Sequence, residues 1–167
     1  MNMHWGELLT VLAESVTLYK DLLLLGDEKR QALVGADTAE LDAITRREEL
    51  RILEGTRLEE RRAKATAAIV TCCNMSDKKP TLLMLADVAD PDTAEQLRTL
   101  GAELDVAVKR LVRLNDTNAA LIHQALHFVQ YNLNLLTRSQ AETTYVPTGA
   151  RKTSSGGAAA MILDRKV

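Results

Sequence analysis

The chain has 167 residues and a formal net charge of −2, with 46% hydrophobic but only 3% aromatic residues. Its length suggests a single domain, and the small net charge gives none of the basic surface that nucleic-acid or anionic-membrane binding requires. Leu and Ala are the most frequent residues, and Glu, Arg and Asp abound, which is typical of coiled coils and long helical bundles.

The two cysteines, Cys72 and Cys73, are adjacent in the sequence. Neighbours in a helix point about 100° apart. No disulfide framework follows, which suits a reducing cytoplasm. Residues 1–6 lack the basic and apolar regions of a signal peptide, and the longest apolar run, residues 22–25, is too short to span a bilayer. We therefore expect a cytoplasmic protein without membrane insertion.

The first predicted helix covers residues 4–33. One face of this helix carries four residues spaced seven apart: Leu12, Tyr19, Gly26 and Leu33. Gly26 is a weak point at which the helix could bend. Gly35 suits the left-handed conformation in which helices often end.

The second predicted helix begins at a capping box, Asp37-x-x-Glu40, and continues toward Cys73. Acidic and basic residues interleave along it, which favours a solvated face over a nucleic-acid site. Residues 74–80 form a polar linker, and residues 81–88 predict a short helix.

The longest predicted helix runs from about Asp90, a plausible N-cap followed by Pro91, to Arg138. Its residues at heptad spacing are Leu97, Leu100, Leu104, Ala107, Leu111, Leu114, Asn118, Leu121, Ala125, Phe128, Asn132 and Leu135. Roughly 48 residues give a rod on the order of 70 Å. An apolar stripe of that length must be covered.

The two earlier helices cannot easily cover the whole stripe as well as each other. We expect the surplus surface between Leu114 and Leu136. Its terminal patch, which includes Phe128 and Val129, either packs within the fold or binds a partner. Asn118 and Asn132 either set helix register at a buried seam or bond to the backbone of a partner.

These elements predict an all-α fold. We expect an elongated antiparallel helical bundle or coiled coil of three long helices plus a short one. Residues 1–138 would form the bundle. Residues 139–167, rich in Ser, Thr, Gly and Ala, would form a flexible C-terminal tail, within which Tyr145 is a candidate docking residue.

The sequence offers no catalytic site. His123 and His127 share a helical face, but neither a general base nor a third ligand accompanies them, and zinc normally takes three or four protein ligands. No nucleophile elbow, phosphate-binding loop or dinucleotide fingerprint occurs. We predict neither enzymatic activity nor a cofactor or metal.

Several segments, taken in order, resemble the FlgN family of flagellar export chaperones. They are the Asp-x-x-x-Leu-x-x-Ile opening of the second helix (residues 37–44), Arg-Glu-Glu-Leu (47–50), Leu-Asn-Asp-Thr-Asn-Ala-Ala-Leu-Ile (114–122), Thr-Tyr-Val-Pro-Thr-Gly (144–149) and the ending from Met161 to Val167. Val146 stands where the family often has glycine. The resemblance covers nearly the whole chain.

This resemblance implies a cytoplasmic chaperone that holds hook-associated (hook–filament junction) proteins by their C-terminal helical segments and delivers them to the type III export gate. Tyr145 would contact the cytoplasmic domain of the large gate protein. The implied substrate-binding residues are Asn118, Leu121, Ile122, Ala125, Phe128, Val129, Asn132, Leu135 and Leu136.

Two other classes of function remain open. The long stripe could close a structural homodimeric coiled coil or adaptor without an export role. A metal-dependent enzyme would have to use His123 and His127.

Overall fold

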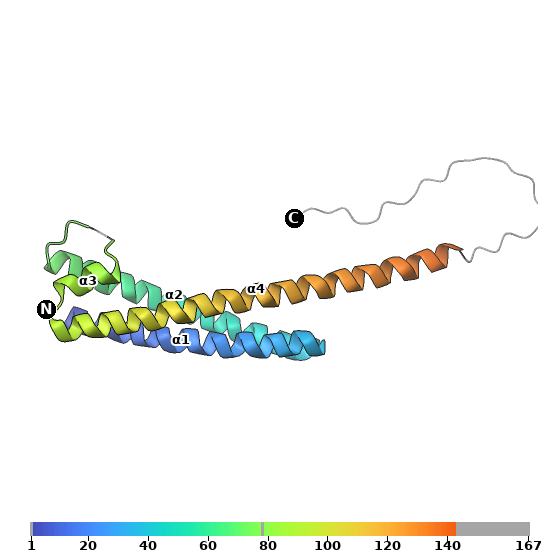
Figure 1. Cartoon of the computed structure of the whole chain (residues 1–167), viewed down its shortest axis with the longest axis horizontal. Coiled ribbons are helices and arrows are strands. Elements are labelled where there is room, and N and C mark those ends of the chain that lie inside the picture. The colour runs from blue at the N-terminus through green and yellow to red at the C-terminus, as the bar shows by residue number, and fades with distance from the viewer. Residues whose placement is uncertain (1, 78, 143–167) are drawn as a thin grey trace, which may run out of the picture. The chain divides into compact units, whose positions relative to one another are not determined.

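The computed structural model describes the backbone of residues 2–77 and 79–142 and the side chains of residues 3–77 and 79–137. All regular elements in this part of the chain are helices: α1 (Asn2–Gly35), α2 (Thr38–Cys72), α3 (Leu82–Val88) and α4 (Pro91–Glu142), as Figure 1 shows. The predicted all-α helical bundle is confirmed. The chain forms two compact units, residues 1–128 and residues 129–167, and the division falls within α4.

The helix starts follow the predicted capping residues. The Asp37 carboxylate accepts a hydrogen bond from the backbone N–H of Glu40 at 3.0 Å, and the Asp90 carboxylate accepts one from the N–H of Thr93 at 3.0 Å. Each bond satisfies an N–H that has no partner inside the helix. The N–H of Thr93 is also the main reason that the pKa of the Asp90 carboxyl lies below its ordinary value.

The turn between α1 and α2 corrects one prediction. The left-handed residue is Ala36, with φ of 52°, and not Gly35, which is the last residue of α1. The N–H of Asp37 donates to the Ala32 carbonyl and that of Ala36 to the Leu33 carbonyl, which makes a Schellman ending. Helix capping therefore puts an alanine in a conformation that favours glycine.

Helix α1 packs against both α2 and α4. Its contacts with α2 form two apolar clusters, Val11, Leu18 and Leu58 with Leu22, and Leu25, Ala32 and Ile44 with Leu41. Its contacts with α4 form a third, in which Leu23 packs on Ala107 and Leu114 beside Tyr19 and Leu111. A fourth cluster, built around Trp5, Leu8, Ile69, Leu85 and Leu97, joins all four helices at the N-terminal end of α1.

Gly26 lies inside α1, which continues without interruption from Asn2 to Gly35. A Cβ added at Gly26 would lie 2.7 Å from Cδ2 of Leu114. The missing side chain therefore lets α1 and α4 approach closely.

Ion pairs between α1 and α2 show the relative direction of the two helices. Arg61 of α2 pairs with Glu7 near the start of α1, and Arg47 pairs with Glu28 near its end. The two helices therefore run in opposite directions. These pairs are largely exposed, so they contribute more to register than to stability.

Candidate partner-binding surface

The apolar stripe of α4 changes character along its length. Leu97, Ala107, Leu114 and Asn118 are all buried. No side chain from residue 125 to residue 137 is buried. The large apolar side chains in this second stretch are each between 49% and 66% exposed: Leu126, Phe128, Val129, Tyr131, Leu133, Leu135 and Leu136.

The length of α1 accounts for the change within the first unit. The contacts Leu8–Leu97 and Gly26–Leu114 show that α1 and α4 run in the same direction. Only nine residues of α1 follow Gly26 before the helix ends at Gly35. Two helices with equal rise per residue then stay in register only to about residue 123 of α4.

Asn118 lies where burial ends. It is 3% exposed, and its Nδ2 donates a hydrogen bond of 2.9 Å to the backbone carbonyl of Gly26. Among the described residues, no group donates a hydrogen bond to its Oδ1. Of the two roles that the sequence leaves open for Asn118, this geometry fits the register role, because the bond can form only where the glycine backbone faces the amide.

The other predicted binding residues lie along the following turns of α4. Leu121 and Asn132 are half-buried, and Ala125 is exposed. Ile122, Phe128, Val129, Leu135 and Leu136 are large exposed apolar side chains. Residues 125–137 thus match the surplus surface expected from the sequence, whereas Leu114 and Asn118 belong to the packed part.

Three exposed apolar residues were missed by the sequence reasoning: Leu126, Tyr131 and Leu133. A usable signal was present. Leu126 and Leu133 belong to a second heptad series, one residue later than the first. Ile122, Val129 and Leu136 of this second series were predicted as binding residues, so its spacing also pointed to Leu126 and Leu133.

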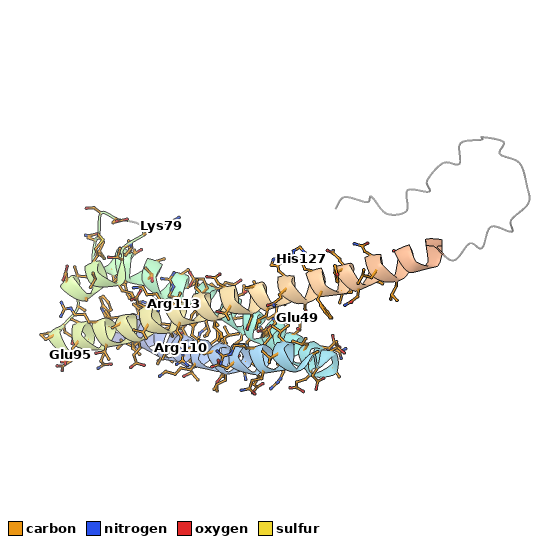
Figure 2. The ribbon with its side chains drawn as sticks, turned by 45° about the vertical axis from the view of Figure 1, so that its right-hand side comes forward. Glu49, Lys79, Glu95, Arg110, Arg113 and His127 are labelled. Carbon is orange, nitrogen blue, oxygen red and sulfur yellow. The ribbon has the colours of Figure 1, made fainter. Side chains whose placement is uncertain are left out.

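The two histidines considered as metal ligands in the sequence lie on α4. His123 and His127 are exposed on α4, where Figure 2 labels His127. Within the described residues, no three His, Cys, Asp or Glu side chains are placed to hold a metal ion. None of the helices described is both long and apolar enough to cross a membrane.

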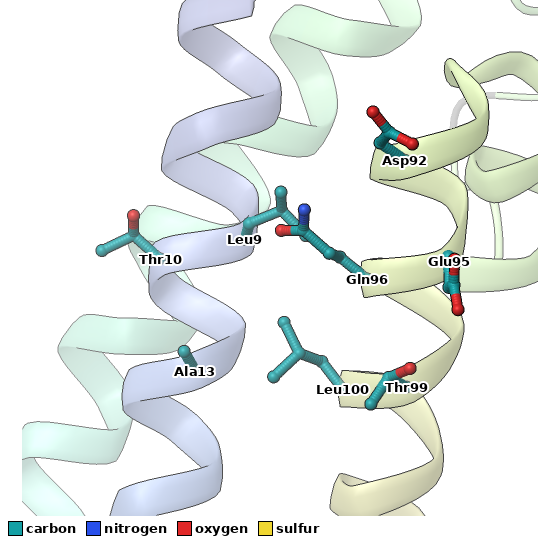
Figure 3. A pocket seen from close by; sticks show the side chains of 8 residues that line it. All are labelled: Leu9, Thr10, Ala13, Asp92, Glu95, Gln96, Thr99 and Leu100. Atoms are coloured by element: carbon teal, nitrogen blue, oxygen red, sulfur yellow. The ribbon is translucent and has the colours of Figure 1, made fainter.

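A cleft of about 800 Å³ lies between α1 and α4. Figure 3 shows Leu9 of α1 and Gln96 and Leu100 of α4 pointing into it, with Asp92 and Glu95 at its edge. Its lining includes two carboxylates and two threonine hydroxyls but no histidine that could act as a general base for them.

A smaller exposed apolar group lies on the other side of α1. Leu24 of α1 is 64% exposed and Leu50 of α2 is 67% exposed. These two leucines line a second cleft, between α1 and α2, together with the ion pairs Arg47–Glu28 and Arg51–Asp21. The pair of leucines is small beside the seven side chains of α4, and isolated exposed leucines are ordinary on protein surfaces.

The predicted tail, residues 139–167, begins too early, because residues 139–142 still belong to α4, which ends at Glu142. Tyr145 and the rest of the predicted tail, residues 143–167, lie outside the described residues. The proposed contact of Tyr145 with the export gate remains a prediction from the sequence.

Comparison with known proteins supports the resemblance found in the sequence. The profile of the FlgN protein family matches residues 1–153. The uncharacterized protein YvyG of Bacillus subtilis (strain 168) is 28% identical over 128 residues, which cover 77% of this chain and 78% of YvyG. No solved structure matches the chain.

Proposed function

Because the chain belongs to the FlgN family of flagellar export chaperones, we propose that it is a cytoplasmic chaperone for hook-associated proteins, the proteins of the hook–filament junction. FlgN is a family of chaperones and not of enzymes. The proposal adds a client, a binding surface and a destination to that general role. In this proposal the protein binds the C-terminal helical segment of the client, prevents the client's premature association and delivers it to the type III export gate.

One observation carries the proposal. Seven large apolar side chains of α4, from Leu126 to Leu136, are about half exposed or more. An apolar stripe at helical spacing is the complement of an amphipathic helix, which docks through residues at positions i, i+3, i+4 and i+7. Exposed apolar groups of this size mark protein interaction sites.

The surface explains how a chaperone can work without a catalytic step. A client segment that later packs against its own kind carries an apolar face. Docking on α4 removes that face from water and from other copies of the client. Release then needs only a competing contact at the gate, because a helix in a groove exchanges without breaking a covalent bond.

The gate contact is the second part of the proposal. We assign it to Tyr145, on the family resemblance alone. Short aromatic motifs dock with small contacts and exchange quickly. The variant Tyr145→Ala should keep the helicity and client affinity of the wild type and lose affinity for the cytoplasmic domain of the gate protein. A loss of helicity would instead make Tyr145 structural.

Calorimetric titration tests the client contact. The purified full chain should bind the C-terminal segment of a hook-associated protein near one-to-one. Phe128→Asp should weaken this binding at least tenfold, because it places a charge in an apolar contact. The matched control is Gln130→Asp, which adds the same charge at an exposed position on another face of α4.

The outcomes separate the proposal from a structural coiled coil. Absence of binding at tens of micromolar, from a protein that sediments as a stable dimer, would favour the homodimeric coiled coil. A large drop in melting temperature for Phe128→Asp, with unchanged affinity, would place Phe128 in packing and not in client binding.

A further inference from the structure

Helix α4 carries two apolar heptad series side by side. The first is Leu121, Ala125, Phe128, Asn132 and Leu135, and the second, one residue later, is Ile122, Leu126, Val129, Leu133 and Leu136. One residue turns a helix by about 100°, so the two series lie on neighbouring faces and together cover roughly half of its circumference. The remaining arc is mainly polar, with His127, Gln130 and Asn134, and also carries Tyr131, which belongs to neither series.

The same pair of neighbouring heptad series occurs in α1, where the helices that each series contacts are known. One series of α1 contains Val11, Leu18, Leu25 and Ala32, and these residues pack on α2. The next series, one residue later, contains Tyr19, Leu23 and Gly26, and these face α4. Two neighbouring series in this protein therefore correspond to two separate packed helices.

One partner helix cannot cover both series. A heptad seam is the contact strip of a single helix whose axis lies about 8–10 Å away. A second seam about 100° around the helix stays in water beside such a partner. The pattern on α4 is therefore wider than the recognition of one amphipathic helix requires.

A second copy of this chain fits the surface poorly. A two-fold dimer buries the same patch on both copies. If two copies met through the first series, the second series would remain exposed on each of them. A partner that brings two helices satisfies both series at once.

We propose that the client binds as two amphipathic helical segments, one on each series of α4. Each segment would match the stretch from Leu121 to Leu136, which is about 22 Å long at 1.5 Å per residue. The polar arc with His127 and Asn134 stays in water. This inference rests on the proposed chaperone function and specifies the form in which the client is recognised.

Three consecutive residues of α4 provide the test, because they point to three different faces. Leu135→Gln alters the first series, Leu133→Gln alters the second, and Asn134→Gln is the matched control on the polar arc. All three positions are exposed, so the variants should fold like the wild type. Calorimetry with a purified, full-length hook-associated protein should show affinity reduced about tenfold or more for each leucine variant, and changed less than about twofold for the control.

Crosslinking gives an independent reading. A photoreactive residue at position 128 and one at position 126 should attach to two different segments of the client. Attachment of both to one segment would overturn the inference.

The failures are distinguishable. Weaker binding by Leu135→Gln with unchanged binding by Leu133→Gln would mean a single client helix and would leave the chaperone function intact. No client binding by the wild type would refute the chaperone function itself. If Leu133→Gln changed only the sedimentation of the free protein, the second series would be a contact between copies of this chain.

Discussion

Two stretches of α4 have the same heptad spacing, but the apolar side chains of one are packed and those of the other are exposed. From Leu97 to Asn118 the stripe is packed against α1, and Leu97 is fully buried. From Leu126 to Leu136 the apolar side chains are exposed. The spacing shows that a helix needs a partner on that face, but it does not show whether the partner belongs to the same chain. Under the proposed function, the first stretch builds the fold and the second binds the client.

Truncating a leucine in each stretch should give the largest contrast. Leu97→Ala removes a fully buried side chain from the cluster that joins all four helices and should lower the free energy of unfolding by roughly 2–5 kcal/mol. Leu135→Ala, at a position 49% exposed, should lower it by less than about 0.5 kcal/mol. Urea denaturation of both variants measures this. Equal losses would mean that the exposed stretch is part of the folded core.

The close approach of α1 and α4 predicts opposite effects for two glycines. In a helix interior Ala is favoured over Gly by about 1 kcal/mol. At Gly6 no atom lies within 4 Å of an added Cβ, so Gly6→Ala should stabilise the protein by up to about that amount. At Gly26 the new Cβ would overlap Leu114, so Gly26→Ala should destabilise it by about 1 kcal/mol.

Thermal denaturation of the two alanine variants decides between crowding and propensity. A stabilising Gly26→Ala would show that α1 and α4 are less tightly packed at this point than the structure indicates.

The turn between α1 and α2 should respond to relief of strain. Ala36 has φ of 52°, and Ala36→Gly should stabilise the protein by about 1 kcal/mol. The gain is partly offset because glycine also adds freedom to the unfolded chain. Asn74, with the same φ, already tolerates this conformation better than alanine does. A drop in melting temperature for Ala36→Gly would contradict the Schellman assignment.

The cap of α4 should give the smallest effect, and one that depends on pH. The pKa of the Asp90 carboxyl is lowered in the folded state from 3.8, chiefly by the N–H of Thr93, so the ionised form favours folding. This stability is present above the unfolded pKa and is lost as the pH falls through the folded pKa. The melting temperature of the wild type should exceed that of Asp90→Ala near neutral pH, and the difference should narrow in acid. A constant difference would exclude the ionised cap as its cause.

The sequence was sufficient for the helices and for the general position of the surface. The capping residues Asp37 and Asp90 are recognised from the residues next to them in the sequence. These local signals predicted the starts of α2 and α4 correctly. The left-handed turn was placed wrongly at Gly35, and the close approach at Gly26 was not predicted, because each depends on context beyond local propensity. Gly26 is explained by Leu114 on another helix, and the left-handed turn falls on Ala36, one residue after Gly35.

The boundary between packed and exposed apolar residues could not be read from spacing. Leu114 and Leu135 occupy equivalent heptad positions and differ only in what lies opposite them. The burial of Asn118 likewise depends on the carbonyl of Gly26, which is distant in sequence. Such facts follow from the relative lengths of α1 and α4 and need a three-dimensional structure.

Hydrogen exchange of the full chain, with and without a purified hook-associated protein, tests most directly whether one stretch folds the protein and the other binds the client. Amide exchange reports opening locally, so it distinguishes the two stretches within a single helix. The client should slow amide exchange across residues 125–137. The exchange rates of Leu8, Leu97 and their neighbours in the packed cluster should stay unchanged. Protection confined to α1 and α2, with none at residues 125–137, would contradict this prediction.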